Sequence, residues 1–299
     1  MSLYDDFFAR ANIGDEAFIP RKGTLTHSPD IQPAGTKLID DPQDYFIGRN
    51  GAQYDVDRGT SITARSRNYI YVRGASALST EGVIELYFVP SSLLMHPNGW
   101  SKNQLKDEKG NTSIPFKALN NQRIVLSTPF VWDNPIPDQH YCLVSRIVTK
   151  RHPNPIPTSL AGWDSFYEWL KESPGIGWRN ISIVNSSLPT STATTDLHIP
   201  QEWDSHDALV YLETIDIPNG VTVSFSSSNI DPPFKLEPQK ITHSPQRFYV
   251  FTKLNSGTMG KVTYTYNRNG IQVPDNAKLV LNVVKLSQIG SVTTVFKRE

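Results

Sequence analysis

Histidine, cysteine, aspartate and glutamate bind metal ions and carry much of enzyme chemistry, and in this sequence they are spread along the chain. None of the seven histidines belongs to an HExxH or HxH motif, and there is one cysteine. A zinc site needs three or four nitrogen or sulfur ligands close together. Asp55 with Asp57, and residues 204–207, offer the oxygen ligands that Ca²⁺ prefers, but solvated turns have the same composition. We therefore predict no metal and no cofactor.

Cys142 is the candidate nucleophile. It stands between Tyr141 and Leu143 in a strand-like run, whereas a reactive thiolate needs a helix N-terminus or a neighbouring cation, so we predict a buried core residue. The sequence has no GxSxG motif, and the glycines of residues 175–177 follow a predicted helix instead of opening one, so they would not cradle a phosphate. Paired carboxylates for glycoside hydrolysis meet only in space and stay open. We predict a non-enzymatic protein.

Exposed tryptophans are the remaining candidates for a binding site. Trp100, Trp163 and Trp203 could contact a protein partner or stack on a sugar, because aromatic side chains are enriched in interaction surfaces. A carbohydrate-binding role needs at least two of them on one exposed face. The competing interpretation is that the tryptophans near residues 163–178 pack a lone helix onto a sheet.

Charge and composition limit the partners. Lys plus Arg and Asp plus Glu are both 29, so the net charge gives no electrostatic preference for nucleic acid. The N-terminal residues have no basic segment followed by an apolar run, and no stretch reaches the roughly 20 apolar residues of a membrane helix. We expect a protein that is cytoplasmic when made, with any export following a route independent of a signal peptide.

The first predicted domain covers residues 27–180, after an N-terminal arm at 1–26 whose aromatic residues are expected to dock on a partner surface. That surface is either the chain's own sandwich, which we favour, or another subunit. Its central strand, residues 141–149, lies between two proline clusters, so the chain enters and leaves this strand through stiff turns. Further strands are predicted at 68–73, 83–89, 122–127 and 129–132, and residues 34–67 are expected to be a long surface excursion with one short strand. Aromatic residues at helical spacing predict one short helix within 158–180, near the domain junction.

The second predicted domain covers residues 181–299. Apolar runs at 208–217, 221–227, 247–254, 261–267 and 278–286 recur at the spacing of a β-sandwich, and turn residues separate them at 218–220 and 269–270. The predicted fold class is therefore all-β, with two immunoglobulin-like antiparallel β-sandwich domains.

Several strand sequences carry a family resemblance. SPDI at 28–31, NYIYVR at 68–73, VIELYFVP at 83–90, HYCLVSRIV at 140–148 and HPNP at 152–155 together resemble bacterial immunoglobulin-like β-sandwich modules with SPDI, NYVYVR-type and HYCLLARI-type strands. The resemblance covers residues 27–157, and the long insert at 34–67 departs from it. Members of this set are accessory or surface modules, so the resemblance implies interaction and supplies no catalytic residue.

These observations favour an interaction or accessory protein that binds protein partners, as a component of a secreted toxin or injection system does. Two alternatives remain. The Ser/Thr-rich alternation at 186–198 and 221–229 is also found in hairpins that open into a β-barrel pore, which would make a membrane the partner. The other alternative is a carbohydrate-binding module that uses the tryptophans, which would make a glycan the partner.

Overall fold

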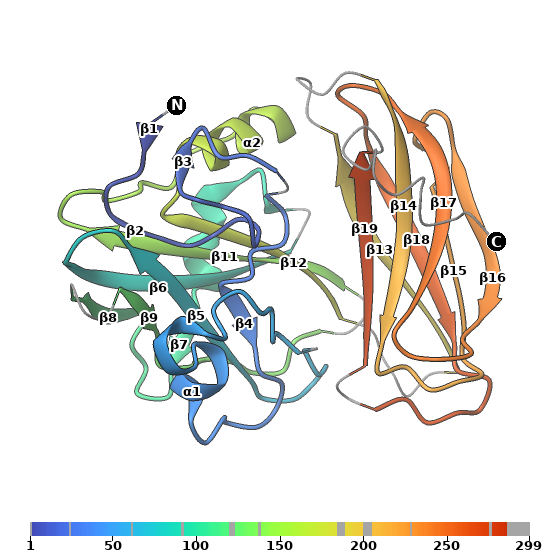
Figure 1. The fold of residues 1–299 in the computed structure, drawn as a ribbon, viewed down its shortest axis with the longest axis horizontal. Helices are drawn as coiled ribbons and strands as arrows, with labels where there is room; N and C mark the ends of the chain where they lie inside the picture. Colours follow the sequence, from blue (N-terminus) through green and yellow to red (C-terminus); the bar gives the residue numbers. More distant parts are fainter. Residues whose placement is uncertain are drawn as a thin grey trace, which may run out of the picture. The chain divides into compact units, whose positions relative to one another are not determined.

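A computed structural model describes residues 2–23, 25–60, 62–90, 93–119, 123–136, 139–183, 189–199, 205–227, 229–274 and 277–285. The chain forms two compact units, Met1–Ile183 and Val184–Glu299. Both are built from antiparallel sheets, so the all-β prediction is confirmed (Figure 1).

Two sheets make the body of the first unit. The six-stranded sheet is centred on β5 (Asn68–Ser76), which pairs with short strands on both sides: β2 (Phe7–Phe8), β4 (Ile31–Pro33), β9 (Ile124–Leu126) and β10 (Phe130–Trp132), the last of which pairs with β7 (Lys106–Asp107). The four-stranded sheet has the order β12 (Ile176–Ile183), β11 (Gln139–Thr149), β6 (Thr80–Pro90), β8 (Ser113–Ala118). A two-stranded sheet joins β1 (Ser2–Leu3) to β3 (Phe18–Ile19).

The strand β11 is central, as its sequence predicted. It pairs with β12 on one side and β6 on the other. Its side chains alternate between two apolar clusters: Tyr141, Leu143 and Ile147 enter the main core, while Cys142 and Val144 enter a second cluster on the opposite face. A strand buried on both faces has apolar residues at consecutive positions, which is why the run at 141–149 lacks simple alternation.

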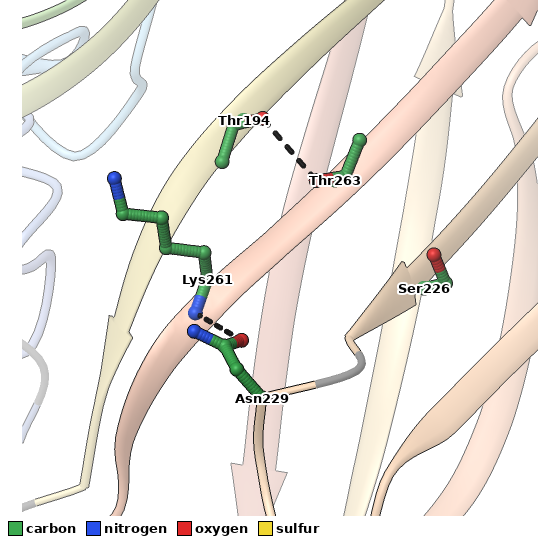
Figure 2. A pocket seen from close by; sticks show the side chains of 5 residues that line it. All are labelled: Thr194, Ser226, Asn229, Lys261 and Thr263. Carbon is green, nitrogen blue, oxygen red and sulfur yellow. Dashed lines mark hydrogen bonds between the residues drawn. The ribbon is translucent and has the colours of Figure 1, made fainter.

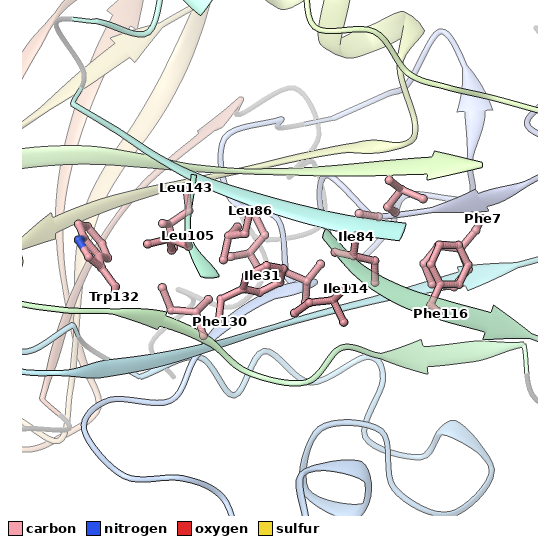
Figure 3. Close-up of a cluster of buried hydrophobic side chains, with 14 of the residues drawn as sticks. Phe7, Ile31, Ile84, Leu86, Leu105, Ile114, Phe116, Phe130, Trp132 and Leu143 are labelled. Carbon is pink, nitrogen blue, oxygen red and sulfur yellow. The ribbon is translucent and has the colours of Figure 1, made fainter. Parts of the chain in front are cut away.

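The main core joins the β5 and β11 sheets. Figure 3 shows its side chains between the strands, with Phe7 of the N-terminal arm beside Phe116 of β8, their ring centroids 4.3 Å apart. Phe7 is fully buried, and β2 pairs with the end of β5. The arm therefore docks on its own chain, because removing its aromatic rings from water stabilises that position.

The helix α2 (Trp163–Glu172) covers the second cluster and lies within the predicted range of 158–180. Pro174 and Gly175 end the helix region, and β12 starts at Ile176, so the helix precedes the last strand of this unit instead of closing it. Trp178, which follows the helix in the sequence, belongs to β12 and packs against the helix from the sheet.

The excursion at 34–67 differs from its prediction. It holds a short helix, α1 (Pro42–Phe46), and a 3-10 turn, η1 (Arg49–Gly51), and its described residues contain no strand. The buried guanidinium of Arg73 on β5 donates to the carbonyl oxygens of Phe46, Gln53 and Val56. One buried cation therefore holds the excursion on the sheet. A further 3-10 helix, η3 (Pro97–Asn103), carries Trp100.

The second unit is a β-sandwich of two sheets (Figure 1). One has the order β13 (Thr190–His198), β18 (Met259–Asn267), β15 (Thr222–Ser227), β16 (Phe234–Lys240). The other has the order β17 (Gln246–Leu254), β14 (His206–Ile215), β19 (Lys278–Lys285). Their inward residues form one core that includes Val210, Leu212, Val223, Phe225 and Val262.

Candidate functional site

Of the three tryptophans predicted to bind a partner, the structure describes Trp100 and Trp163. Trp100 is fully buried in the second cluster of the first unit, so its prediction as an exposed contact residue was wrong. Trp163 is half-buried and stacks on Trp178 with ring centroids 6.0 Å apart. Trp203 lies outside the described residues. Trp100 and Trp163 meet through Phe166 of α2, which both contact edge-on, and this aromatic cluster fixes the helix on the sheet.

A buried charge cluster in the first unit centres on Asp30, within the SPDI sequence. Arg10 Nη2 donates to Asp30 Oδ1 over 2.8 Å, and Arg73 Nε donates to the same oxygen over 3.1 Å. Tyr54 donates its hydroxyl to Asp30 Oδ2 over 3.1 Å. Each oxygen of the fully buried carboxylate thus accepts several charged or polar hydrogens, as a structural ion cluster requires. We assign it to folding, not to chemistry on a substrate.

Asp55 and Asp57, considered as calcium ligands, face arginines instead, and Asp204 of the other candidate segment, 204–207, lies outside the described residues. Arg10 Nη1 lies 2.8 Å from Asp55 Oδ1, and Arg179 Nη1 lies 3.0 Å from Asp57 Oδ2. Burial alone would raise the pKa of Asp57, but Arg179 and His27 outweigh it and hold that pKa well below its usual range. Within the described residues, no three His, Cys, Asp or Glu side chains gather as metal ligands.

The outward face of the β17–β14–β19 sheet carries exposed aromatic side chains. We call the paired outward residues of β14 and β17 the aromatic face; from one end to the other, the cross-strand pairs are Asp207–Lys253, Leu209–Phe251, Tyr211–Tyr249 and Glu213–Arg247. Phe251 is 71% exposed and Tyr249 is 46% exposed. The residues that alternate with these outward ones along the two strands point into the core; they include Val210, Leu212, Phe248 and Leu254. Both faces of these two strands are therefore apolar, although only one is covered by the part of the chain that the structure describes.

Charged pairs close each end of the aromatic face. Arg247 Nε lies 2.7 Å from Glu213 Oε1, and this contact raises the pKa of Arg247. The same guanidinium lies over the ring of Tyr211, 5.5 Å from its centroid, and Tyr211 meets Tyr249 at a centroid distance of 5.6 Å with a 44° tilt. Burial raises the pKa of Tyr211. Tyrosine, phenylalanine and arginine side by side, with charges at the rim, are the composition of a protein interface.

The opposite face of the second unit is polar. Hydroxyl side chains point outward in register from β13, β18 and β15, as in the rungs Thr192–Thr265–Ser224 and Thr194–Thr263–Ser226. A shallow hollow of 430 Å³ lies there (Figure 2), lined by Thr194, Ser226, Asn229, Lys261 and Thr263.

Some of the polar groups of this hollow bind one another. Thr194 and Thr263 share a hydrogen bond of 3.2 Å between their hydroxyl oxygens, and the backbone nitrogen of Lys261 donates to Asn229 Oδ1 over 3.0 Å. These contacts satisfy groups that a ligand would otherwise use, so the hollow is a weaker candidate than the aromatic face.

The Ser/Thr-rich runs predicted at 186–198 and 221–229 contribute two strands of this polar sheet, an edge strand β13 and an internal strand β15. Residues 186–188 and 228 lie outside the described residues. Among the described residues, no helix has both the length and the apolar content to cross a membrane.

No known protein family matches the chain, and no curated protein sequence matches it. Among solved structures, it is similar to the secreted serine protease VesC from Vibrio cholerae at 8% identity and a TM-score of 0.24, over 75% of this chain and 48% of that one. It is also similar to the C-terminal globular domain of an oligosaccharyltransferase from Pyrococcus abyssi at 11% identity and a TM-score of 0.13, over 74% of this chain and 41% of that one. The chain thus spans less than half of either structure, and at these TM-scores neither informs the function.

The residues predicted to bind a partner were all tryptophans, and the paired residues of the aromatic face include none, so the sequence-based prediction did not contain this face. The signal was nevertheless present: in RFYVFTKL (residues 247–254), apolar residues occupy both alternation classes of a strand. Such a strand either lies between two covered faces or presents one apolar face to a partner.

Proposed function

We propose that this protein is a non-enzymatic interaction module and that the aromatic face of its second unit is the surface that contacts a protein. The observation that carries the proposal is the 71% exposure of Phe251 next to Tyr249 on an ordered strand. Isolated exposed apolar residues are common on protein surfaces, but a contiguous aromatic group between charged pairs is typical of interfaces. An accessory role in a secreted toxin or injection system is one setting for such a module.

A protein partner fits this face better than a glycan does. A flat sugar-binding platform presents its aromatic rings in one plane, whereas Tyr211 and Tyr249 are tilted by 44°. Arg247 and Glu213 pair with each other at the end of the face, which suits a charged protein rim. The pore-forming alternative rests on sequence texture, and the strands concerned lie in the other sheet.

The proposal is tested with the full chain and two matched variants. Phe251→Ser removes the exposed ring, and Ile136→Ser removes a similarly exposed apolar side chain, 57% exposed, from the first unit. Each protein is immobilised and exposed to lysate and culture supernatant of the producing organism, to a glycan array and to dye-loaded liposomes. Proteins retained by the natural chain are purified and their binding is measured directly by calorimetry.

We expect binding of a purified protein that F251S loses and I136S keeps, with circular dichroism unchanged in both variants. Glycan binding lost in F251S would replace the proposal with a carbohydrate-binding function. Dye release by the natural chain would replace it with the pore-forming function. Equal protein binding by F251S and the natural chain would reject the aromatic face as the contact surface.

A further inference from the structure

The charge pattern of the aromatic face is complementary to itself. Each end holds one acidic residue on β14 and one basic residue on β17: Asp207 with Lys253 at one end, and Glu213 with Arg247 at the other. The acidic residues thus lie in one column and the basic residues in the neighbouring column, with the apolar pairs between them. A surface with this arrangement can face an identical copy so that opposite charges meet.

We infer that the aromatic face binds a second copy of this chain, and this inference rests on the proposed function of that face. The proposed two-fold axis lies between β14 and β17 and runs parallel to them. Rotation about that axis exchanges the two columns and keeps the position along the strands. Asp207 then faces Lys253 of the second copy, and Glu213 faces Arg247 of the second copy.

The same rotation brings the apolar centres together. Tyr211 faces Tyr249 of the second copy, and Leu209 faces Phe251, so the exposed ring of Phe251 becomes covered by an aliphatic side chain. Two sheets in this arrangement have nearly aligned strands, the commonest packing of sheet faces. Lys253 and Arg247 are long enough to follow the twist between the sheets and still reach an acidic partner.

The alternative two-fold arrangement is electrostatically unfavourable. In that arrangement the two-fold axis lies in the plane of the face and runs perpendicular to the strands. Each strand then lies over the same strand of the second copy, with its direction reversed. Lys253 would then face Arg247 of the second copy, and Asp207 would face Glu213. Like charges at both ends of the face oppose that dimer, so the charge pattern selects the parallel axis.

The size of the face predicts a reversible dimer. Seven residues along each strand and two strands of width give a footprint of roughly 250 Å² per copy. A standard stable interface covers about 800 Å² per partner. We therefore expect monomer at micromolar concentration and dimer toward millimolar concentration, with the rim charges adding a dependence on salt.

Sedimentation equilibrium and small-angle scattering of the full chain over this concentration range test the inference. With the parallel axis, K253E places a carboxylate over Asp207 of the second copy at two symmetric positions, and we expect dimerisation to weaken about tenfold. The double variant D207K/K253E restores opposite charges and is expected to restore dimerisation. K240E, the matched reversal of an exposed lysine at the end of β16 on the other sheet, is expected to change nothing.

Two results overturn the inference without bearing on the proposed function. One is a natural chain that stays monomeric at every concentration. The other is a K253E variant that dimerises as well as or better than the natural chain, because the perpendicular axis would place its new carboxylate over Arg247. If the natural chain is monomeric and F251S loses binding to a purified partner protein, self-association is rejected and the proposed function stands. If F251S alters neither dimerisation nor partner binding, both the dimer and the proposed function of the aromatic face are rejected.

Discussion

Substitution of Asp30 by asparagine tests the buried charge cluster that ties the N-terminal arm, β4 and β5 of the first unit together. Asn has nearly the same shape but no charge, so Arg10 and Arg73 would lose their common counterion while their side chains stay 4% and 0% exposed. Asp55 would remain 2.8 Å from Arg10, but its side chain is 80% exposed, so water screens that contact. Breaking a buried pair from one side costs about 3 to 5 kcal/mol.

The loss is large compared with the about 5 to 15 kcal/mol that stabilises an ordinary domain. At a urea slope of about 2 kcal/mol per M, the midpoint of unfolding should fall by about 2 M. Five of the six tryptophans belong to the first unit, so fluorescence during urea titration reports mainly on the unit that holds Asp30.

Asp133→Asn is the matched control for this change. Asp133 also pairs with an arginine, at 2.7 Å from Arg67 Nε, but the two side chains are 50% and 55% exposed. An exposed pair is worth about 1 kcal/mol or less, so its midpoint should move by about 0.5 M at most. Equal shifts in D30N and D133N would refute the argument, because they would mean that water reaches the Asp30 cluster.

Three further predictions follow from the first unit. At pH 7, Asp57→Asn should lower stability by about 1 to 3 kcal/mol in thermal denaturation. Because its pKa is lowered in the folded state, Asp57 stabilises the fold above the ordinary Asp pKa of about 3.9, and this stabilisation is lost in stronger acid. The stabilities of the variant and the natural chain should therefore converge as the pH falls. A stability difference that does not change with pH would contradict this argument. Gly82→Ala should lower the free energy of unfolding by about 1 to 3 kcal/mol or more, since an added Cβ would lie 2.1 Å from the Val148 carbonyl oxygen. Gly99 has open space around it, so Gly99→Ala should change the free energy of urea unfolding by about 0.5 kcal/mol or less. Cys142, 1% exposed, should react with a thiol reagent only in denaturant, and rapid reaction of the native protein would show that β11 opens.

Strand positions were largely predictable because they depend on local residue type and alternation. The predicted run at 141–149 is β11 (Gln139–Thr149), and the run at 247–254 is β17 (Gln246–Leu254). The helix boundary was less predictable, since the aromatic spacing continues into Trp178, and only its pairing with Val144 on β11 makes that residue part of a strand. Sheet hydrogen bonds between distant segments overrode the local helical pattern.

The all-β class, the central strand and the buried Cys142 could be predicted from the sequence, because each depends on local residue types and on the tendency of apolar residues to leave water. The surface on which the N-terminal arm docks became clear only in the fold, where β2 pairs with β5 and Phe7 is fully buried. Tertiary structure alone decided which large side chains remain at the surface. Trp100 is covered by α2 and its neighbours, whereas Phe251 lies on the outward side of a two-layer sandwich. An aromatic residue has the same local signal in both places, so its exposure is set by the elements that the rest of the chain packs over it.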